Sequence, residues 1–96
     1  MRTAAECASI GDIREAIDQL DHDIITLIGQ RYEYVKAAVK FKTDEASVKA
    51  SDRVAAMMQK RRAWAVDVGL NADVIEKLYR DLIDYFIQDE MARLVT

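Results

Sequence analysis

The stretch that decides the fold is DIREAIDQLDHDIITLIGQRYEYVKAAVKFK, residues 12–42. Its apolar residues recur at helical spacing and form one face, which is typical of a long amphipathic α-helix: Ile13, Ile17, Leu20, Ile24, Leu27, Ile28, Val35, Ala38 and Phe41. The only glycine or proline within it is Gly29. We therefore predict one helix from near Ser9–Asp12 to about residue 41, with Ser9 as its N-terminal cap.

Two shorter helices are predicted in the second half of the chain. Residues 43–50 are polar and show no period, so a loop is expected there. Ser51 is placed to cap a second helix that ends at Gly69, and Asn71 is placed to cap a third. The second helix carries its apolar pattern on Val54, Met57, Met58, Arg61, Trp64, Ala65 and Val68. The prediction is an all-α fold with three helices per chain, one long and two shorter.

Composition narrows the class of protein further. With 96 residues the chain fits a single domain spanning residues 1–96. A content of 51% hydrophobic and 32% charged residues excludes a disordered chain and a membrane protein, and a net charge of −3 argues against nucleic-acid binding. Three glycines and no proline exclude all-β folds and glycine-rich phosphate loops.

The chain shows no sign of export or of membrane association. Cys7 is the single cysteine, so it forms no disulfide within the chain. No apolar segment approaches the roughly 20 residues of a membrane span, and residues 1–15 hold no signal-peptide core. We expect a protein of the reducing cytoplasm, with no membrane or nucleic-acid partner.

Helix length predicts a dimer. A helix of about 30 residues is roughly 45 Å long, whereas the other two helices reach little more than half of that length. Two short helices cannot cover the apolar face of the long one, so a second chain has to bury much of it. We predict a homodimer with paired long helices.

Charged residues stand where the apolar pattern of the long helix requires apolar ones. Steps of four and three from Ile24 lead to Arg31 and Lys42. These two residues either form internal ion pairs or line an anion pocket inside the bundle. Arg14 lies at the edge of the same face, about 25 Å from Arg31 along the helix, so it can reach such a pocket only in a second, antiparallel chain.

The third helix carries a matching acidic residue. Tyr79, Ile83, Phe86 and Glu90 follow one face, so Glu90 closes an apolar stripe. It is expected to be the salt-bridge partner of Arg31 or Lys42, with or without a role in a site. Other candidates are weaker: His22 and the basic run Lys60–Arg62 are interpreted as solvated, and Met57, Met58 and Trp64 as core. The residues offer no nucleophile–base set and no metal-ligand cluster.

Four segments resemble the all-α chorismate mutase class, and more closely its branch of isochorismate-pyruvate lyases, which make salicylate for siderophores. They are DIREAIDQLDHDIITLIGQR (12–31), YVKAAVKFK (34–42), RVAAM (53–57) and WAVDVGL (64–70). The resemblance runs from about residue 5 to residue 92. It implies an intertwined homodimeric helical bundle with two shared sites, each receiving one arginine from the partner's long helix.

The resemblance also implies roles for individual residues. Arg14 of the partner and Arg31 would hold the two carboxylates of the substrate, and Lys42 would donate to its ether oxygen, with Arg53 lining the pocket. The reactions are concerted and pericyclic, so no cofactor or metal is implied. Lys42 and Glu90 would be the catalytic residues, and both would also contact the substrate.

Two positions bear on the choice of substrate. Val54 stands where dedicated chorismate mutases carry a glutamate, which favours the lyase. Glu90 stands where the lyase branch has glutamine, and a carboxyl must be protonated to donate a hydrogen bond as glutamine does. The expected activity is conversion of isochorismate to salicylate and pyruvate, with secondary conversion of chorismate to prephenate. Chorismate mutase as the main activity and a non-catalytic helical dimer or adaptor remain the alternatives.

Overall fold

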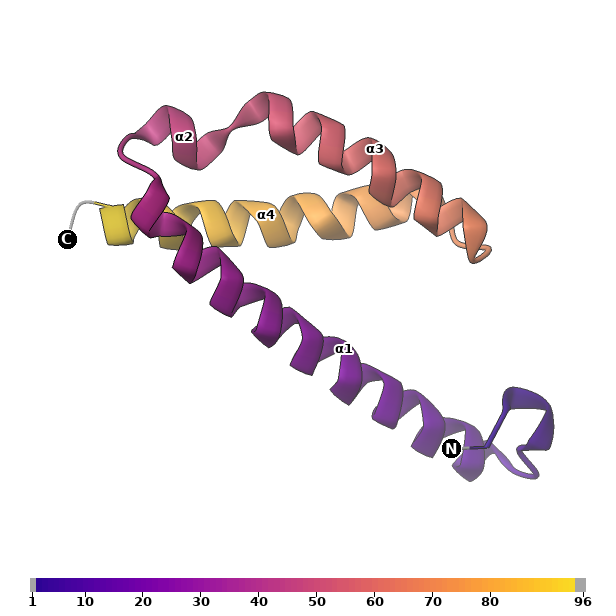
Figure 1. The fold of residues 1–96 in the computed structure, drawn as a ribbon. Coiled ribbons are helices and arrows are strands. Elements are labelled where there is room, and N and C mark those ends of the chain that lie inside the picture. Colours follow the sequence, from indigo (N-terminus) through magenta and orange to yellow (C-terminus); the bar gives the residue numbers. More distant parts are fainter. Residues whose placement is uncertain (1, 95–96) are drawn as a thin grey trace. The chain divides into compact units, whose positions relative to one another are not determined.

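The computed structural model describes residues 2–94, and over that range it contains helices and no strand (Figure 1). The chain divides into two compact units, Met1–Tyr34 and Val35–Thr96, which are described one at a time. The elements are η1 (Ala4–Glu6), α1 (Ile10–Ala38), η2 (Val39–Phe41), α2 (Glu45–Lys49), α3 (Ser51–Asp67) and α4 (Ala72–Leu94). The predicted all-α class and the three main helices α1, α3 and α4 are confirmed.

The start of α1 confirms the predicted cap. The backbone N–H of Asp12 donates to Ser9 Oγ at 3.1 Å, and Asp12 Oδ2 accepts from the N–H of Ala8 at 2.9 Å. These bonds satisfy backbone donors that a helix start leaves without partners. At its other end α1 tightens into the 3₁₀ turn η2, so the helical backbone reaches Phe41 as expected.

The segment expected to be a loop contains the short helix α2. Asp44 caps it: Asp44 Oδ1 accepts from the backbone N–H of Ser47 at 2.8 Å, and Ser47 Oγ accepts from the N–H of Asp44. Ala50 ends α2 in the left-handed conformation, with φ 37° and ψ 57°, and α3 follows directly. Ala50 therefore takes the N-cap position of α3 that we had predicted for Ser51, which is the first residue of the helix.

The turn between α3 and α4 follows the prediction closely. Gly69 has φ +81°, its N–H donates to Val66 O at 3.0 Å, and the N–H of Leu70 donates to Ala65 O at 2.8 Å. This pair of bonds is a Schellman motif, which ends the helix at a glycine. Asn71 Oδ1 then accepts from the backbone N–H groups of residues 73 and 74 and caps α4.

Helices α3 and α4 lie side by side and antiparallel within the Val35–Thr96 unit (Figure 1). Met57, Met58 and Ile83 form the core between them, and residues 54, 79 and 87 pack against it. The two methionines are buried as predicted. The prediction for Trp64 is wrong for the single chain: 56% of the residue is exposed, because its ring lies against Arg61 instead of entering the core.

An ion-pair network joins α3 to α4. Arg62 Nη1 contacts Asp73 Oδ1 at 2.8 Å and Glu76 Oε1 at 2.9 Å, and Arg80 contacts Glu76 Oε2. The hydrogen bond to Asp73 raises the pKa of Arg62, and the hydrogen bond from Arg80 lowers the pKa of Glu76. The basic run is thus solvated at Lys60 but structural at Arg62.

The apolar stripe of α1 is exposed in the single chain. Its members are between 41% and 60% exposed: Ile13, Ile17, Leu20, Ile24 and Leu27. His22 is exposed too, as expected. None of the helices formed by residues 2–94 is long and apolar enough to cross a membrane.

Candidate active site

The site is built around a contact between Lys42 and Glu90, which lie 48 positions apart in the sequence. Lys42 Nζ donates to Glu90 Oε2 at 2.6 Å. Glu90 is 5% exposed, and the Lys42 side chain is 24% exposed. The ion pair confirms the prediction that Glu90 is the salt-bridge partner of one of the two basic residues, and identifies Lys42 as that residue.

Local structure explains how each of the two residues reaches this position. Lys42 is the first residue after η2, where its N–H donates to Val39 O and its backbone turns extended. Glu90 lies about one helical turn beyond Phe86 on α4, on the face that Ile83 and Phe86 bury. A carboxylate buried on an apolar face requires a charged or hydrogen-bonding partner, and the Lys42 ammonium provides it.

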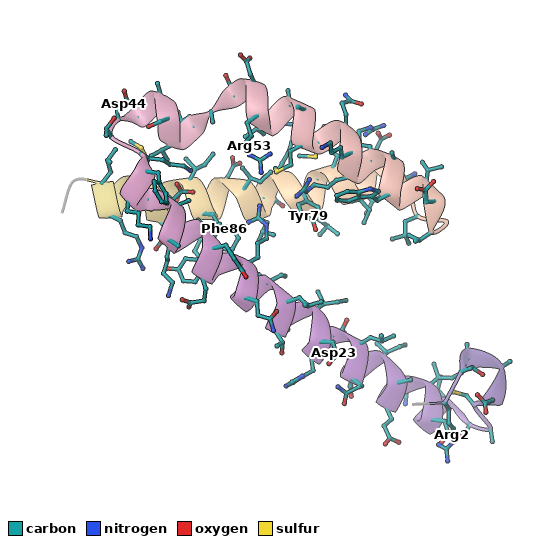
Figure 2. The ribbon with its side chains drawn as sticks, in the orientation of Figure 1. Arg2, Asp23, Asp44, Arg53, Tyr79 and Phe86 are labelled. Carbon is teal, nitrogen blue, oxygen red and sulfur yellow. The ribbon has the colours of Figure 1, made fainter. Side chains whose placement is uncertain are left out.

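The other predicted site residues are found on α1 and α3. Arg14 is exposed on α1 and Arg31 is half-buried on the same helix, both within the Met1–Tyr34 unit. Since α1 is continuous from Ile10 to Ala38, the two arginines lie about 25 Å apart along it, as predicted. Arg53 is exposed in the first turn of α3 (Figure 2). Of the predicted residues, the structure brings Lys42 and Glu90 together.

This pair has a limited chemical repertoire. An ammonium in a largely buried setting supplies positive potential and a hydrogen-bond donor to an oxygen that gains negative charge. A carboxyl beside it acts as an acceptor when ionised and as a donor when protonated. Within residues 2–94 no group of three histidine, cysteine or acidic residues is placed to hold a metal ion.

One cluster outside this pair was missed. Arg61 lies with its guanidinium carbon 5.3 Å from the ring centroids of both Trp64 and Tyr79, and its Nη1 donates to Met57 O at 3.2 Å. The sequence did place Arg61 in the apolar pattern of α3, four residues after Met57 and three before Trp64. Its inclusion in a basic run of three residues concealed that signal.

Comparisons with known proteins point to one family. Residues 13–91 match the family "Chorismate mutase type II". The chain is 44% identical over 91 residues to the protein named "Isochorismate pyruvate lyase" of Pseudomonas aeruginosa, an alignment that covers 95% of this chain and 90% of that protein. It is 37% identical over 73 residues to the "T-protein" of Haemophilus influenzae, covering 75% of this chain and 19% of that longer protein.

Proposed function

Because this chain belongs to the chorismate mutase type II family, we propose that it is an isochorismate-pyruvate lyase with secondary chorismate mutase activity. The observation that carries the proposal is the Lys42–Glu90 pair, a donor and a carboxyl 2.6 Å apart in a largely buried setting. The 44% identity to a lyase over nearly the whole of both chains supports isochorismate as the main substrate. The relevant chain is residues 1–96 acting as one domain, in the cytoplasm and without a cofactor.

The reaction requires no chemical group of the protein to form or break a bond. In isochorismate the bond between the ring carbon and the ether oxygen breaks while a ring hydrogen moves to the methylene carbon of the enolpyruvyl group, which gives salicylate and pyruvate. Every atom that moves belongs to the substrate, so no nucleophile or external base takes part. The protein contributes a compact substrate conformation and a cation near the ether oxygen, where negative charge develops.

Lys42 is the residue best placed to supply that cation. Its ammonium is held by Glu90, so its position is set before the substrate arrives. A donor that is already oriented stabilises the developing charge without the cost of reorganising at the moment of reaction. We propose that Lys42 donates to the ether oxygen and that Arg53, in the first turn of α3, lines the same pocket.

Glu90 must change its role when the substrate binds. In the free chain its carboxyl accepts one of the three N–H groups of the Lys42 ammonium, so the others remain for the ether oxygen. A carboxylate beside that oxygen would repel the charge that develops there, whereas a protonated carboxyl would donate to it. We therefore propose that the catalytically active form carries a proton on Glu90.

The two substrate carboxylates require further cations, which we assign to a homodimer. Arg31 of one subunit and Arg14 of the other would each bind one carboxylate through paired N–H groups. The five half-exposed apolar residues of α1 support this assembly, because a continuous exposed apolar stripe marks a surface that another molecule covers. An antiparallel pair of α1 helices would deliver Arg14 to the partner's site.

Steady-state assays on both substrates test the function. Salicylate fluorescence reports turnover of isochorismate, and prephenate formation reports turnover of chorismate. The proposal expects a higher kcat/KM for isochorismate. A higher value for chorismate would make mutase the main activity, an outcome for which Glu90 in place of the lyase glutamine is the supporting feature. Turnover of neither substrate by the folded dimer would leave a non-catalytic helical assembly.

A further inference from the structure

Arg61 is a half-buried cation without a carboxylate partner in its own chain. The Trp64 and Tyr79 rings flank its guanidinium and one Nη atom donates to Met57 O, but no acidic residue among residues 2–94 pairs with it. Arg62, the next residue, has two carboxylate partners within the chain. A guanidinium withdrawn from water without a carboxylate is costly, so an acidic group from outside the chain would complete this cluster.

The composition of the cluster is typical of an interface. Arginine, tryptophan and tyrosine are enriched among the residues that dominate binding energy between proteins. Trp64 is 56% exposed although it is the largest side chain of the α3–α4 pair. The Arg61 cation lies against two aromatic rings, and one of them, Trp64, is exposed. A partner surface that is both apolar and acidic would fit this arrangement.

The first half of α1 has that chemistry. Between residues 12 and 23 the apolar stripe is accompanied by five acidic residues and one arginine: Asp12, Glu15, Asp18, Asp21, Asp23 and Arg14. Asp21 follows Leu20 and so lies directly beside the stripe. It is exposed, and among residues 2–94 the structure gives it no ion pair, whereas the carboxylate of Asp23 accepts from Gln19.

The spacing along the two helices matches. Asp21 follows Arg14 by seven residues, on the same edge of α1 and about 10.5 Å further along it. Arg61 follows Arg53 by eight residues, about 12 Å further along α3 and about 80° around it. A second copy whose α1 runs beside α3 in the same direction, with Arg14 beside Arg53, would bring Asp21 to the level of Arg61 along the helix, where the long arginine side chain can turn toward it.

We infer that the surface formed by Arg61, Trp64 and Tyr79 docks the α1 helix of a second copy of this chain, with Arg61 binding Asp21 of the partner subunit. The inference rests on the proposed function, because Arg14 enters the partner's site near Arg53 only in the shared-site dimer. The Arg61–Asp21 pair sets the register of α1 along α3. It thereby positions Arg14 at the substrate.

The test measures dimer dissociation by sedimentation velocity on dilution of the full chain. Asp21→Arg is the primary variant, because Asp21 is exposed and its replacement removes no contact within the subunit. Loss of a buried interfacial charge pair costs about 2–5 kcal/mol, so the dimer Kd should rise roughly 30-fold or more. Arg61→Glu should act in the same direction. Combining the two reversals should return Kd to within about threefold of the native value, because the pair is then restored with opposite charges.

Matched controls isolate the pair. Asp18→Arg makes the same charge change one turn earlier on α1, and Lys60→Glu makes the reverse change next to Arg61; both should leave Kd within about threefold of native. A dimer whose Kd is unmoved by Asp21→Arg, or equally weakened by Asp18→Arg, overturns the inference while leaving the shared site intact. A native chain that stays monomeric at every concentration overturns both.

Discussion

Lys42 and Glu90 show how a buried carboxyl on one helix is held by a lysine from another part of the chain. The two residues lie 48 positions apart in the sequence, and their 2.6 Å contact buries the carboxylate almost completely. The pair neutralises a buried carboxyl and, in the proposed mechanism, supplies a donor to the ether oxygen. Variants can separate these two roles. Two predictions follow from it, and a third concerns a purely structural ion pair.

Removal of the lysine tests its contribution to the reaction. Lys42→Ala should lower kcat/KM about 100- to 1000-fold, because a preorganised donor to a developing negative charge is lost. Lys40→Ala is the control, since Lys40 is exposed and lies over the Phe41 ring instead of facing Glu90. Because Lys42→Ala leaves a carboxylate buried alone, Lys42→Ala/Glu90→Gln should be the better folded of the two variants and equally inactive. A double variant with native activity would contradict the role of Lys42.

The proton on Glu90 is tested by pH. If the active form carries the protonated carboxyl, native kcat/KM should be lower at high pH than at low pH, because a carboxylate cannot donate to the ether oxygen. Glu90→Gln donates at every pH, so its profile should stay flat and its rate should exceed the native rate at high pH. Two flat and equal profiles across neutral pH would rule the idea out.

The Glu76 network gives a prediction about stability. Arg80 and Arg62 lower the pKa of Glu76 in the folded chain, so the ionised form stabilises the fold above the ordinary glutamate pKa. That contribution disappears as the pH falls through the lowered pKa. Glu76→Gln should therefore be less stable than the native chain at pH 7, with the difference vanishing once the pH has fallen below the lowered pKa of Glu76. Urea unfolding at several pH values measures this, and a pH-independent difference would contradict it.

At the scale of elements, helix ends account for both the successes and the failures of prediction. The sequence indicated the caps at Ser9 and Asn71 because their side-chain oxygens accept from backbone N–H groups two or three residues later. It indicated the helix end at Gly69 because a residue without Cβ readily adopts the left-handed conformation of that turn. The loop prediction for residues 43–50 failed because the five residues of α2 are too few to show a helical period. The end of α2 was also missed, since Ala50 adopts a left-handed conformation that its residue type disfavours. Such a conformation depends on what surrounds the residue and leaves no mark in the sequence.

Substitutions at the two left-handed positions should affect the free energy of unfolding differently. Gly69→Ala should lower the free energy of unfolding by about 1 kcal/mol, since φ is +81° although the added Cβ would meet nothing within 4 Å. Ala50→Gly should be neutral within about 0.5 kcal/mol, because relief of strain offsets the entropy that glycine gains in the unfolded chain. Thermal or urea unfolding of both variants measures this. An Ala50→Gly loss as large as that of an ordinary helical position, about 1 kcal/mol, would contradict the account.

The predicted ion pair was found where the apolar pattern itself carried a charge. Lys42 and Glu90 interrupt apolar stripes, and the structure brings them together. Arg61 also interrupts a stripe, but its partners are rings, and nothing in the sequence distinguishes an aromatic clamp from a solvated basic run. Periodicity therefore locates buried charges, whereas the identity of their partners comes from tertiary packing.

At the scale of the whole molecule, two features of α1 support the proposed assembly. Twenty-nine residues give a rod about 44 Å long, and its apolar stripe is half-exposed in the single chain. Arg14 and Arg31 lie too far apart on that rod to bind one small dicarboxylate within one subunit. The proposed dimer resolves both features, because a second α1 covers the stripe and brings the Arg14 of one chain to the Arg31 of the other.

Mixing two inactive variants tests this central claim most directly. Arg14→Ala and Arg31→Ala subunits, each inactive alone, are combined, allowed to exchange, and assayed on isochorismate by salicylate fluorescence. Heterodimers carry one intact site and one doubly altered site, so a random mixture should recover about a quarter of native activity. Native mass spectrometry verifies the exchange. Proven heterodimers without recovered activity would contradict a site shared between two chains.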